Sequence, residues 1–120
     1  MDIVKKDIGG NTEAEVVLYQ PDSSIHIEVL VEGETVWLTQ QQIAQLFDKS
    51  VSVISRHISN IIKDGELDEK SNLQKMQIAN SDKPVVFYNL DMIISIGYRC
   101  SGQRATRLRI WATSILKQHL

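Results

Sequence analysis

The sequence contains few of the residues that define specialised protein classes. Its single cysteine, Cys100, excludes an intrachain disulfide and is typical of a reducing cytoplasm. One thiol and three scattered histidines show no metal-ligand spacing, so we expect neither a metal nor a cofactor. No apolar run approaches the length of a membrane span, and no apolar segment follows a basic start as in a signal peptide. These absences predict a cytoplasmic protein without a membrane partner.

Enzymatic signatures are missing as well. His26, His57 and His119 lie far apart in the sequence, and no nucleophile motif or phosphate-binding glycine loop is present. We therefore expect no catalytic residues and no enzyme. The composition of the 120 residues, 42% apolar and 23% charged, is that of an ordinary globular protein. The expected organisation is a flexible leader over residues 1–14 and one domain over residues 15–120, which can also be the N-terminal part of a longer protein.

Charge is distributed unevenly along the chain. Residues 1–36 contain eight acids and two lysines, a net charge of −6, whereas residues 92–120 contain four arginines, one lysine and no acid, a net charge of +5. The total of −2 speaks by itself against DNA binding, because phosphate contacts dominate DNA affinity. The asymmetry is compatible with one side that faces DNA and another that faces solvent or a partner.

Residues 39–63 have the pattern of two short helices joined by a polar turn. Thr39 and Gln42 have the spacing of a capping box, and Ser50 is placed to cap the second helix. Asp48 stands where helix-turn-helix motifs usually have glycine, and aspartate tolerates the left-handed conformation. Apolar residues form one stripe on each helix: Ile43, Ala44, Leu46 and Phe47 on the first, and Val51, Ile54, Ile58, Ile61 and Ile62 on the second.

The face opposite the second stripe carries no acid, and this predicts contact with nucleic acid. Small and hydrogen-bonding side chains suit base edges, and cations suit phosphates. Ser52, Arg56 and Asn60 are the expected base readers. The full set of expected DNA-binding residues is Gln40, Ser50, Ser52, Val53, Arg56, Ser59, Asn60 and Lys63. A plain helical hairpin with a solvated polar face is the alternative interpretation.

Alternating apolar residues predict strands on both sides of this segment. We expect a strand over residues 15–19 and a β-hairpin over residues 25–38, with Trp37 and Leu38 packed under the first helix. Gly65 is expected to follow the last residue of the second helix in the left-handed conformation.

After an acidic connection over residues 66–72, strands at 73–79 and 85–88 form a second hairpin in the position of a wing. Its Lys75 and Lys83 either contact DNA or are solvated. Two helices follow, one capped by Asn89 or Asp91 and one over about residues 103–119.

Residues 85–120 contain two long motifs. A block Y-Y-N-L-D-x-I-I-S-x-G-Y-R is matched from Tyr88 to Arg99, and a block R-G-T-x-F-R-I-W-A-T is matched at Arg104 and from Arg109 to Thr113. The segment thereby resembles the RhuM family of bacterial virulence-associated and mobile-element proteins, and the likeness covers roughly residues 16–120. The departures at Phe87, Ala105 and Leu108 are packing substitutions. The resemblance implies a DNA-binding domain, often at the N-terminus of a longer protein.

The arginines near the second block allow two interpretations. Arg99, Arg107 and Arg109 can form a phosphate patch, because guanidinium groups match phosphate oxygens. Alternatively, Arg104 and Arg109 pair with acids of the N-terminal segment, and Arg104 has the stronger structural interpretation because it lies on an apolar stripe.

These patterns predict an α+β fold, a winged helix-turn-helix with an N-terminal β-hairpin and two C-terminal helices. The predicted function is sequence-specific binding of double-stranded DNA through a recognition helix at about residues 51–63, in a regulator of transcription or of a mobile element. Ile110 and Leu116 lie off the apolar stripe of the last helix and indicate a second contact, with a homodimer partner or a downstream effector domain. The alternative function is a protein-interaction or targeting module for such an effector.

Overall fold

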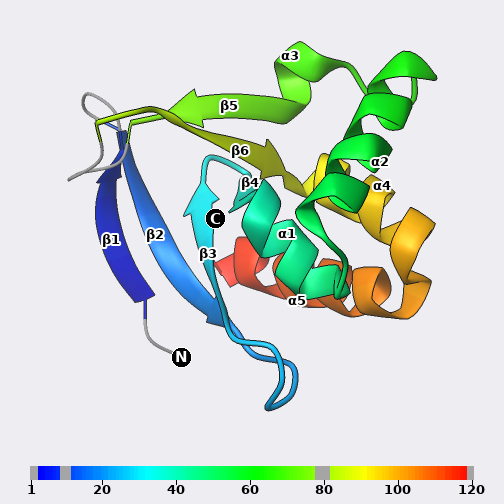
Figure 1. The fold of residues 1–120 in the computed structure, drawn as a ribbon. Helices are drawn as coiled ribbons and strands as arrows, with labels where there is room; N and C mark the ends of the chain where they lie inside the picture. The colour runs from blue at the N-terminus through cyan, green and yellow to red at the C-terminus, as the bar shows by residue number, and fades with distance from the viewer. Residues whose placement is uncertain (1–2, 9–11, 78–81, 119–120) are drawn as a thin grey trace.

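The computed structural model describes residues 3–8, 12–77 and 82–118, and shows a curved antiparallel sheet with helices packed on one face (Figure 1). In the described residues the sheet has six strands in the order β1-β2-β3-β4-β6-β5. The mixed α+β class expected from the sequence is confirmed. The elements are β1 (Ile3–Ile8), β2 (Thr12–Tyr19), β3 (Ile27–Glu32), β4 (Thr35–Thr39), α1 (Gln40–Phe47), α2 (Val51–Lys63), α3 (Glu69–Asn72), β5 (Leu73–Met76), β6 (Val85–Asn89), α4 (Leu90–Cys100) and α5 (Gly102–Gln118).

The sheet corrects the sequence prediction at its N-terminal end. Instead of a leader over residues 1–14, β1 and the start of β2 form an antiparallel pair, from Ile3 opposite Val17 to Ile8 opposite Thr12. An edge strand gains much of its stability from backbone pairing and needs few apolar side chains. The polar composition of residues 1–14 therefore did not indicate that β1 is a strand. The two expected hairpins also belong to one sheet, because β4 pairs with β6.

The two faces of the sheet bury different clusters. Strand residues that point toward the helices, such as Val29 and Leu38, share the main core with α1, α2, α4 and α5. Residues of the opposite parity form a second cluster within the curve of the sheet, made of Ala14, Val16, Leu30, Trp37, Met76 and Phe87. Leu38 therefore packs under the helices as expected, but Trp37 does not. Its neighbouring position in the strand sends its side chain to the other face, where Nε1 donates to the Glu32 carbonyl at 3.2 Å.

Local capping defines the ends of α1 and α2 as the sequence predicted. The Thr39 hydroxyl accepts a hydrogen bond from the Gln42 amide, and the Gln42 side chain accepts one from the Thr39 amide. Ser50 caps α2 by accepting from the Val53 amide at 3.2 Å. Between the helices Asp48 takes the left-handed conformation, with φ 54° and ψ 51°. The turn is therefore set by residues within the segment itself.

The far end of α2 is also closed locally. Gly65 has a φ of +74°, and its amide donates to the Ile62 carbonyl while the Glu66 amide donates to the Ile61 carbonyl. These two bonds form the Schellman arrangement, which satisfies carbonyls in the last turn of a helix. The stripe on α2 is shorter than expected, since Val51 is 44% exposed.

Two features between α2 and α5 depend on contacts distant in sequence. The connection expected over residues 66–72 contains the short helix α3, capped by Asp68. Gly97 of α4 lies so close to α5 and α1 that an added Cβ would meet the Ala105 Cβ and the Phe47 ring at 2.6 Å. Glycine at this position therefore sets how closely the three helices approach.

Candidate nucleic-acid interface

The outer face of α2 is a continuous polar surface. Successive helical residues are rotated by about 100°, which places the exposed side chains within an arc of about that width. The buried residues Ile54, Ile58 and Ile61 lie on the opposite side. We call the exposed polar side chains the α2 face; they are Ser52, Ser55, Arg56, Ser59 and Lys63. No acidic residue occurs anywhere in α2.

Most polar groups of the α2 face have no partner in the described part of the chain. Ser55, Arg56, Ser59 and Lys63 make no hydrogen bond or ion pair there. Ser52 is the exception, because its hydroxyl lies 3.1 Å from that of Ser50. Donors and acceptors that the fold does not use are held on a rigid helix, where they can contact a ligand without breaking existing bonds.

The structure moves two predicted residues away from the centre of this face. Val53 and Asn60 are half-buried on the flank of α2. Ser55 is exposed at the edge of the α2 face that borders the groove described below, and it was not among the residues predicted for the site. Its position four residues before Ser59, on the same side of the helix, is the signal that could have identified it.

Two other predicted contacts support the helix itself. The half-buried Gln40 uses its side-chain amide to donate to the Val51 carbonyl at 3.1 Å, which links the start of α1 to the start of α2. Ser50 is occupied as the helix cap. Both residues lie beside the N-terminus of α2, where the free amides and the helix dipole favour anions.

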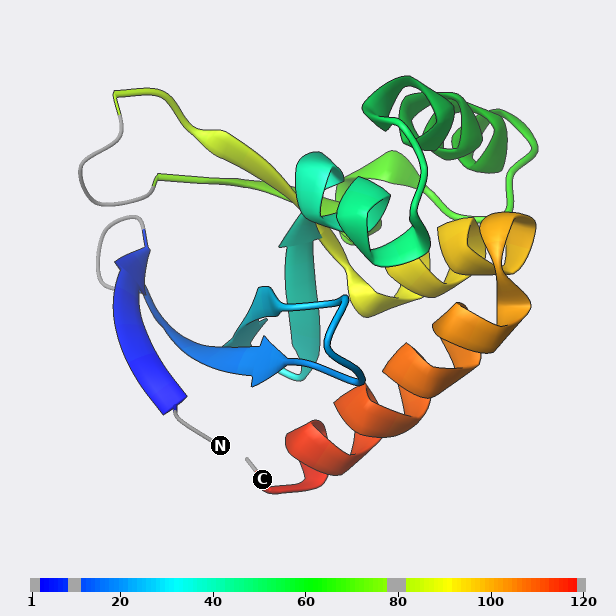
Figure 2. The ribbon, with the colours of Figure 1, turned by 60° about the horizontal axis from the view of Figure 1, so that its bottom comes forward.

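A groove of about 410 Å³ runs along one side of the α2 face. It separates α2 from α3 and from the ends of β5 and β6. Its polar lining includes Gln40, Ser55, Ser59, Lys63 and Glu69. Figure 2 shows α2 and the β5–β6 hairpin in the upper half of the molecule, on either side of α1. Lys75 is exposed on β5.

The local field on the flank of α2 is positive despite the acidic total. Partly buried His57 has a pKa below its usual value, chiefly because burial disfavours the imidazolium. The positive charges of Arg56, Arg99 and Lys49 lower the pKa of His57 further. An anion near this flank would meet several cations at once.

The expected phosphate patch is divided among separate surroundings. Arg99 lies 3.6 Å from Asp64 and 3.8 Å from Glu66. Arg107 lies 4.0 Å from Asp22, so one arginine does pair with an acid of the N-terminal segment. Arg109 is exposed and lies two residues further along α5, which turns it to a different side of the helix.

Arg104 has the structural role expected of it but a different partner. Its guanidinium donates to the Leu46 carbonyl at 3.0 Å rather than to a carboxylate. This carbonyl is in the last turn of α1, where helices leave acceptors unsatisfied. The bond therefore ties α5 to the end of α1.

The geometry defines an α+β domain that presents the acid-free α2 face to solvent. Residues 65–120 match the model of the Virulence protein RhuM family, so the resemblance seen in the sequence is confirmed over this part of the chain. The match begins at Gly65 and does not include the α2 face. Comparison with curated proteins and with solved structures gave no match. None of the described helices is long and apolar enough to cross a membrane.

Proposed function

We propose that the chain binds double-stranded DNA as a winged helix-turn-helix, with α2 as the recognition helix in the major groove. The observation that carries the proposal is the α2 face, an acid-free helical surface on which Arg56, Lys63 and two of the three serines make no hydrogen bond or ion pair within the described residues. The major groove is wide enough to admit one α-helix, and small side chains permit close approach to base edges.

The topology around α2 also supports this assignment. Strand β4 leads into α1, α2 follows after a tight turn, and β5 and β6 then form a hairpin whose strand β6 pairs back with β4. A winged helix-turn-helix has this order of helices and strands. In it the hairpin after the recognition helix lies against the neighbouring backbone or groove, the position that Lys75 would occupy.

The side chains of the α2 face divide by chemistry. Arg56 suits bidentate contact with guanine, and Ser52, Ser55 and Ser59 suit short contacts to bases or phosphates. Lys63, at the end of the helix, suits a phosphate as a point charge. Gln40 acts through α2 by fixing its start, while Val53 and Asn60 lie at the edge of the contact. The proposed role is that of a regulator of transcription or of a mobile element.

A fluorescence-anisotropy titration against random duplex DNA, repeated from low to moderate salt, tests direct binding. We expect log affinity to fall linearly with log salt, because each neutralised phosphate releases condensed counterions. Lys63→Ala should weaken binding to all sequences and reduce the salt slope by about 0.9. Lys117→Ala removes an exposed lysine at the far end of α5 and is the matched control, with the slope unchanged.

Absence of binding at low salt would favour the other candidate, a protein-interaction or targeting module. Two exposed apolar side chains support that candidate, since Tyr98 is 55% exposed and Ile110 is 59% exposed. Isolated apolar residues are common on surfaces, and for that reason DNA binding is the first proposal. If the chain associates with a protein, or with a second copy of itself, and salt does not weaken that association, the interaction module replaces DNA binding as the proposed function.

A further inference from the structure

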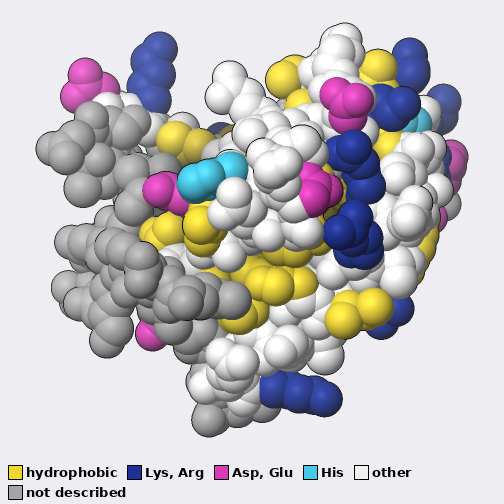
Figure 3. Space-filling view, turned by 90° about the horizontal axis from the view of Figure 1, so that it is seen from below, with side chains coloured by type: hydrophobic (Ala, Val, Ile, Leu, Met, Phe, Trp, Pro, Cys, Tyr) yellow, Lys and Arg dark blue, Asp and Glu magenta, His cyan; other side chains and the backbone are white. Residues whose placement is uncertain are grey.

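A second hollow lies on the side of the molecule away from α2. It is an open groove of about 670 Å³ between the end of β2 and the helix α5, within the size range of small-molecule sites. Its apolar walls and rim come from Leu18, Tyr19, Pro21, Ile110 and Trp111, and Arg107 lies at one end. Figure 3 shows hydrophobic side chains gathered on this face, with Lys and Arg side chains to one side.

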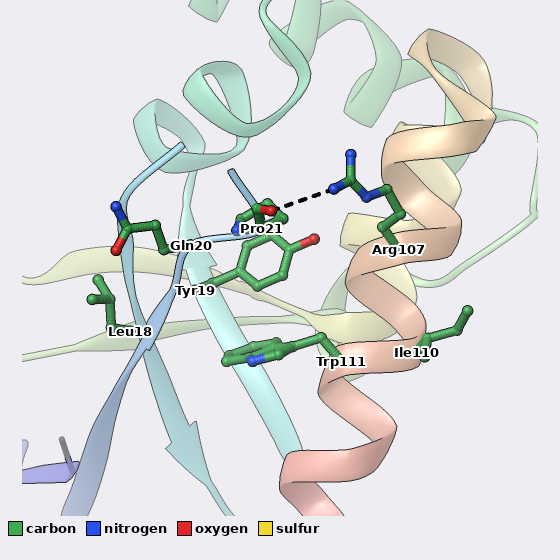
Figure 4. Close-up of a pocket in the computed structure, with 7 residues that line it drawn as sticks. All are labelled: Leu18, Tyr19, Gln20, Pro21, Arg107, Ile110 and Trp111. Carbon is green, nitrogen blue, oxygen red and sulfur yellow. Dashed lines mark hydrogen bonds between the residues drawn. The ribbon is translucent and has the colours of Figure 1, made fainter. Parts of the chain in front are cut away.

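Two aromatic rings form the floor of the groove. The ring centroids of Tyr19 and Trp111 are 4.7 Å apart, with the ring planes inclined at 51°. Figure 4 shows the Tyr19 hydroxyl directed to the side of the groove on which Arg107 lies. The Tyr19 hydroxyl and the Trp111 indole N–H make no hydrogen bond within the described residues. The groove therefore offers polar groups as well as apolar area to a ligand.

Arg107 has hydrogen-bonding capacity that the fold does not use. A guanidinium has five N–H donors. Within the described residues the Arg107 guanidinium donates one long hydrogen bond, from Nη2 to the Pro21 carbonyl at 3.4 Å. Its contact with Asp22 is also long, at 4.0 Å, and both side chains are nearly half exposed. The positive end of the groove is thus only partly neutralised.

Asp22 is the group that would oppose an incoming anion, and it is held by other contacts. Its carboxylate accepts hydrogen bonds from the Ser24 amide and hydroxyl, which are the main cause of its lowered pKa, and both Arg107 and Arg104 lower the pKa further. Its carboxylate is thus engaged by Ser24 and lies 4.0 Å from Arg107, the one of the two arginines that lines the groove.

From this arrangement we propose that the groove between β2 and α5 binds a small organic anion, an apolar ring or branched chain that carries one carboxylate. The apolar part would lie on Trp111 and Tyr19, and the carboxylate would accept from Arg107. Inorganic phosphate or a DNA backbone fits less well, because neither has an apolar body to cover Trp111 and Ile110. The proposal does not depend on DNA binding, since none of these residues belongs to the α2 face.

The test uses the complete chain and a ¹H–¹⁵N correlation spectrum, in which the two tryptophan indole groups give separate signals. Cyclohexylacetate is the probe, cyclohexylacetamide is its uncharged analogue, and acetate supplies the charge without the apolar body. Trp111→Phe assigns the reporting signal. Trp37 is the internal control, because its indole is bonded to the Glu32 carbonyl in the other cluster.

We expect a saturable shift of the Trp111 signal with cyclohexylacetate, about tenfold weaker affinity for the amide and no effect of acetate. Arg107→Met should lower affinity for the acid about tenfold, because it keeps the apolar stem and removes the charge. Arg109→Met changes an exposed arginine on another side of α5 and should leave affinity unchanged. An unchanged Trp37 signal would show that each variant is folded.

Equal affinity for acid and amide, or unchanged affinity in Arg107→Met, would overturn the proposal. The same holds if no probe gives a saturable shift. If the Trp111 signal instead moves with protein concentration while sedimentation reports a dimer, the groove is a contact between two copies of this chain, and the small-anion proposal is wrong.

Discussion

The polar side chains of α4 and α5 and those of the α2 face differ in what they bond to. Asn89 caps α4 and donates to the Ser71 carbonyl and the Asn72 side chain. Arg104 donates to the end of α1, and Arg99 lies near two carboxylates. Most side chains of the α2 face have no such partner among the described residues. Asn89, Arg99 and Arg104 in the first region thus stabilise the fold, whereas most polar side chains of the α2 face are presented to solvent.

The difference separates the similarity to the RhuM family model from the proposed binding specificity. The matched residues 65–120 include the bond from Asn89 to Asn72 of α3 and the Arg104 donor that binds the Leu46 carbonyl of α1. The match therefore reports on the supporting framework, and it contains no information about the residues of the α2 face, all of which precede Gly65. Substitutions in the two regions should accordingly change different observables.

Leu108→Ala should have the largest effect, and on stability alone. Leu108 is fully buried in the main core, so the substitution removes apolar contacts and leaves a cavity. We expect the free energy of unfolding to fall by about 2–5 kcal/mol. Chemical denaturation measures this loss. DNA affinity measured where the variant is folded should equal that of the unchanged protein; a loss there would mean that the framework itself contacts DNA.

Arg56→Ala should have the opposite profile. Removing a guanidinium that reads a base should cost about 1–3 kcal/mol of binding free energy and relax specificity at one base pair. Stability should stay within about 0.5 kcal/mol, because the side chain is exposed and makes no bond in the described residues. Anisotropy titrations with matched and mismatched duplexes measure the change, with Lys117→Ala as the control. Unchanged affinity for every duplex would exclude α2 as the docking helix.

Gly97→Ala should destabilise the protein by about 1–2 kcal/mol, because the cost of overpacking exceeds the gain in helix propensity. The added Cβ would meet the Ala105 Cβ and the Phe47 ring at 2.6 Å. Gly102→Ala is a matched control, since its nearest neighbour is a Tyr98 ring carbon at 3.9 Å. Thermal or chemical unfolding compares the two variants. Equal stability would mean that the helices separate without cost.

The smallest expected effect concerns pH. The pKa of His57 is lowered in the folded protein, so the unfolded chain binds more protons just below the usual histidine pKa. Stability should therefore rise with pH from the lowered folded pKa up to about 6.5. His57→Gln should flatten this part of the profile, as measured by denaturation at several pH values. An unchanged slope would assign the dependence to another group.

Local signals in the sequence predicted the α1–α2 segment well. Thr39, Gln42 and Ser50 act within three residues of their partners, and Gly65 ends α2 by bonds to its own last turn. Such contacts depend on sequence spacing alone. The apolar stripes were predicted for the same reason, with the exposed Val51 as the error.

Predictions failed where a distant segment decides the outcome. The sequence did not predict β1, which pairs with β2. Alternation predicted strands at β4 and β6, but it does not show that these two strands are neighbours. Trp37 has the apolar character expected of a core residue, yet only the curvature of the whole sheet provides the second cluster that buries it. Helical period placed Val53 and Asn60 on the exposed face of α2, but the fold partly covers both side chains, and their contact with DNA stays a prediction.

The bond from Arg104 to the Leu46 carbonyl has a mechanical consequence. Arg104, Arg107 and Trp111 lie on one side of α5 at helical spacing. The single helix α5 therefore connects the end of α1, which Arg104 contacts, with the groove beside β2, which Arg107 and Trp111 line. A force that displaces α5 at Trp111 also pulls on the last turn of α1. That turn leads directly into Asp48, the left-handed hinge from which α2 projects.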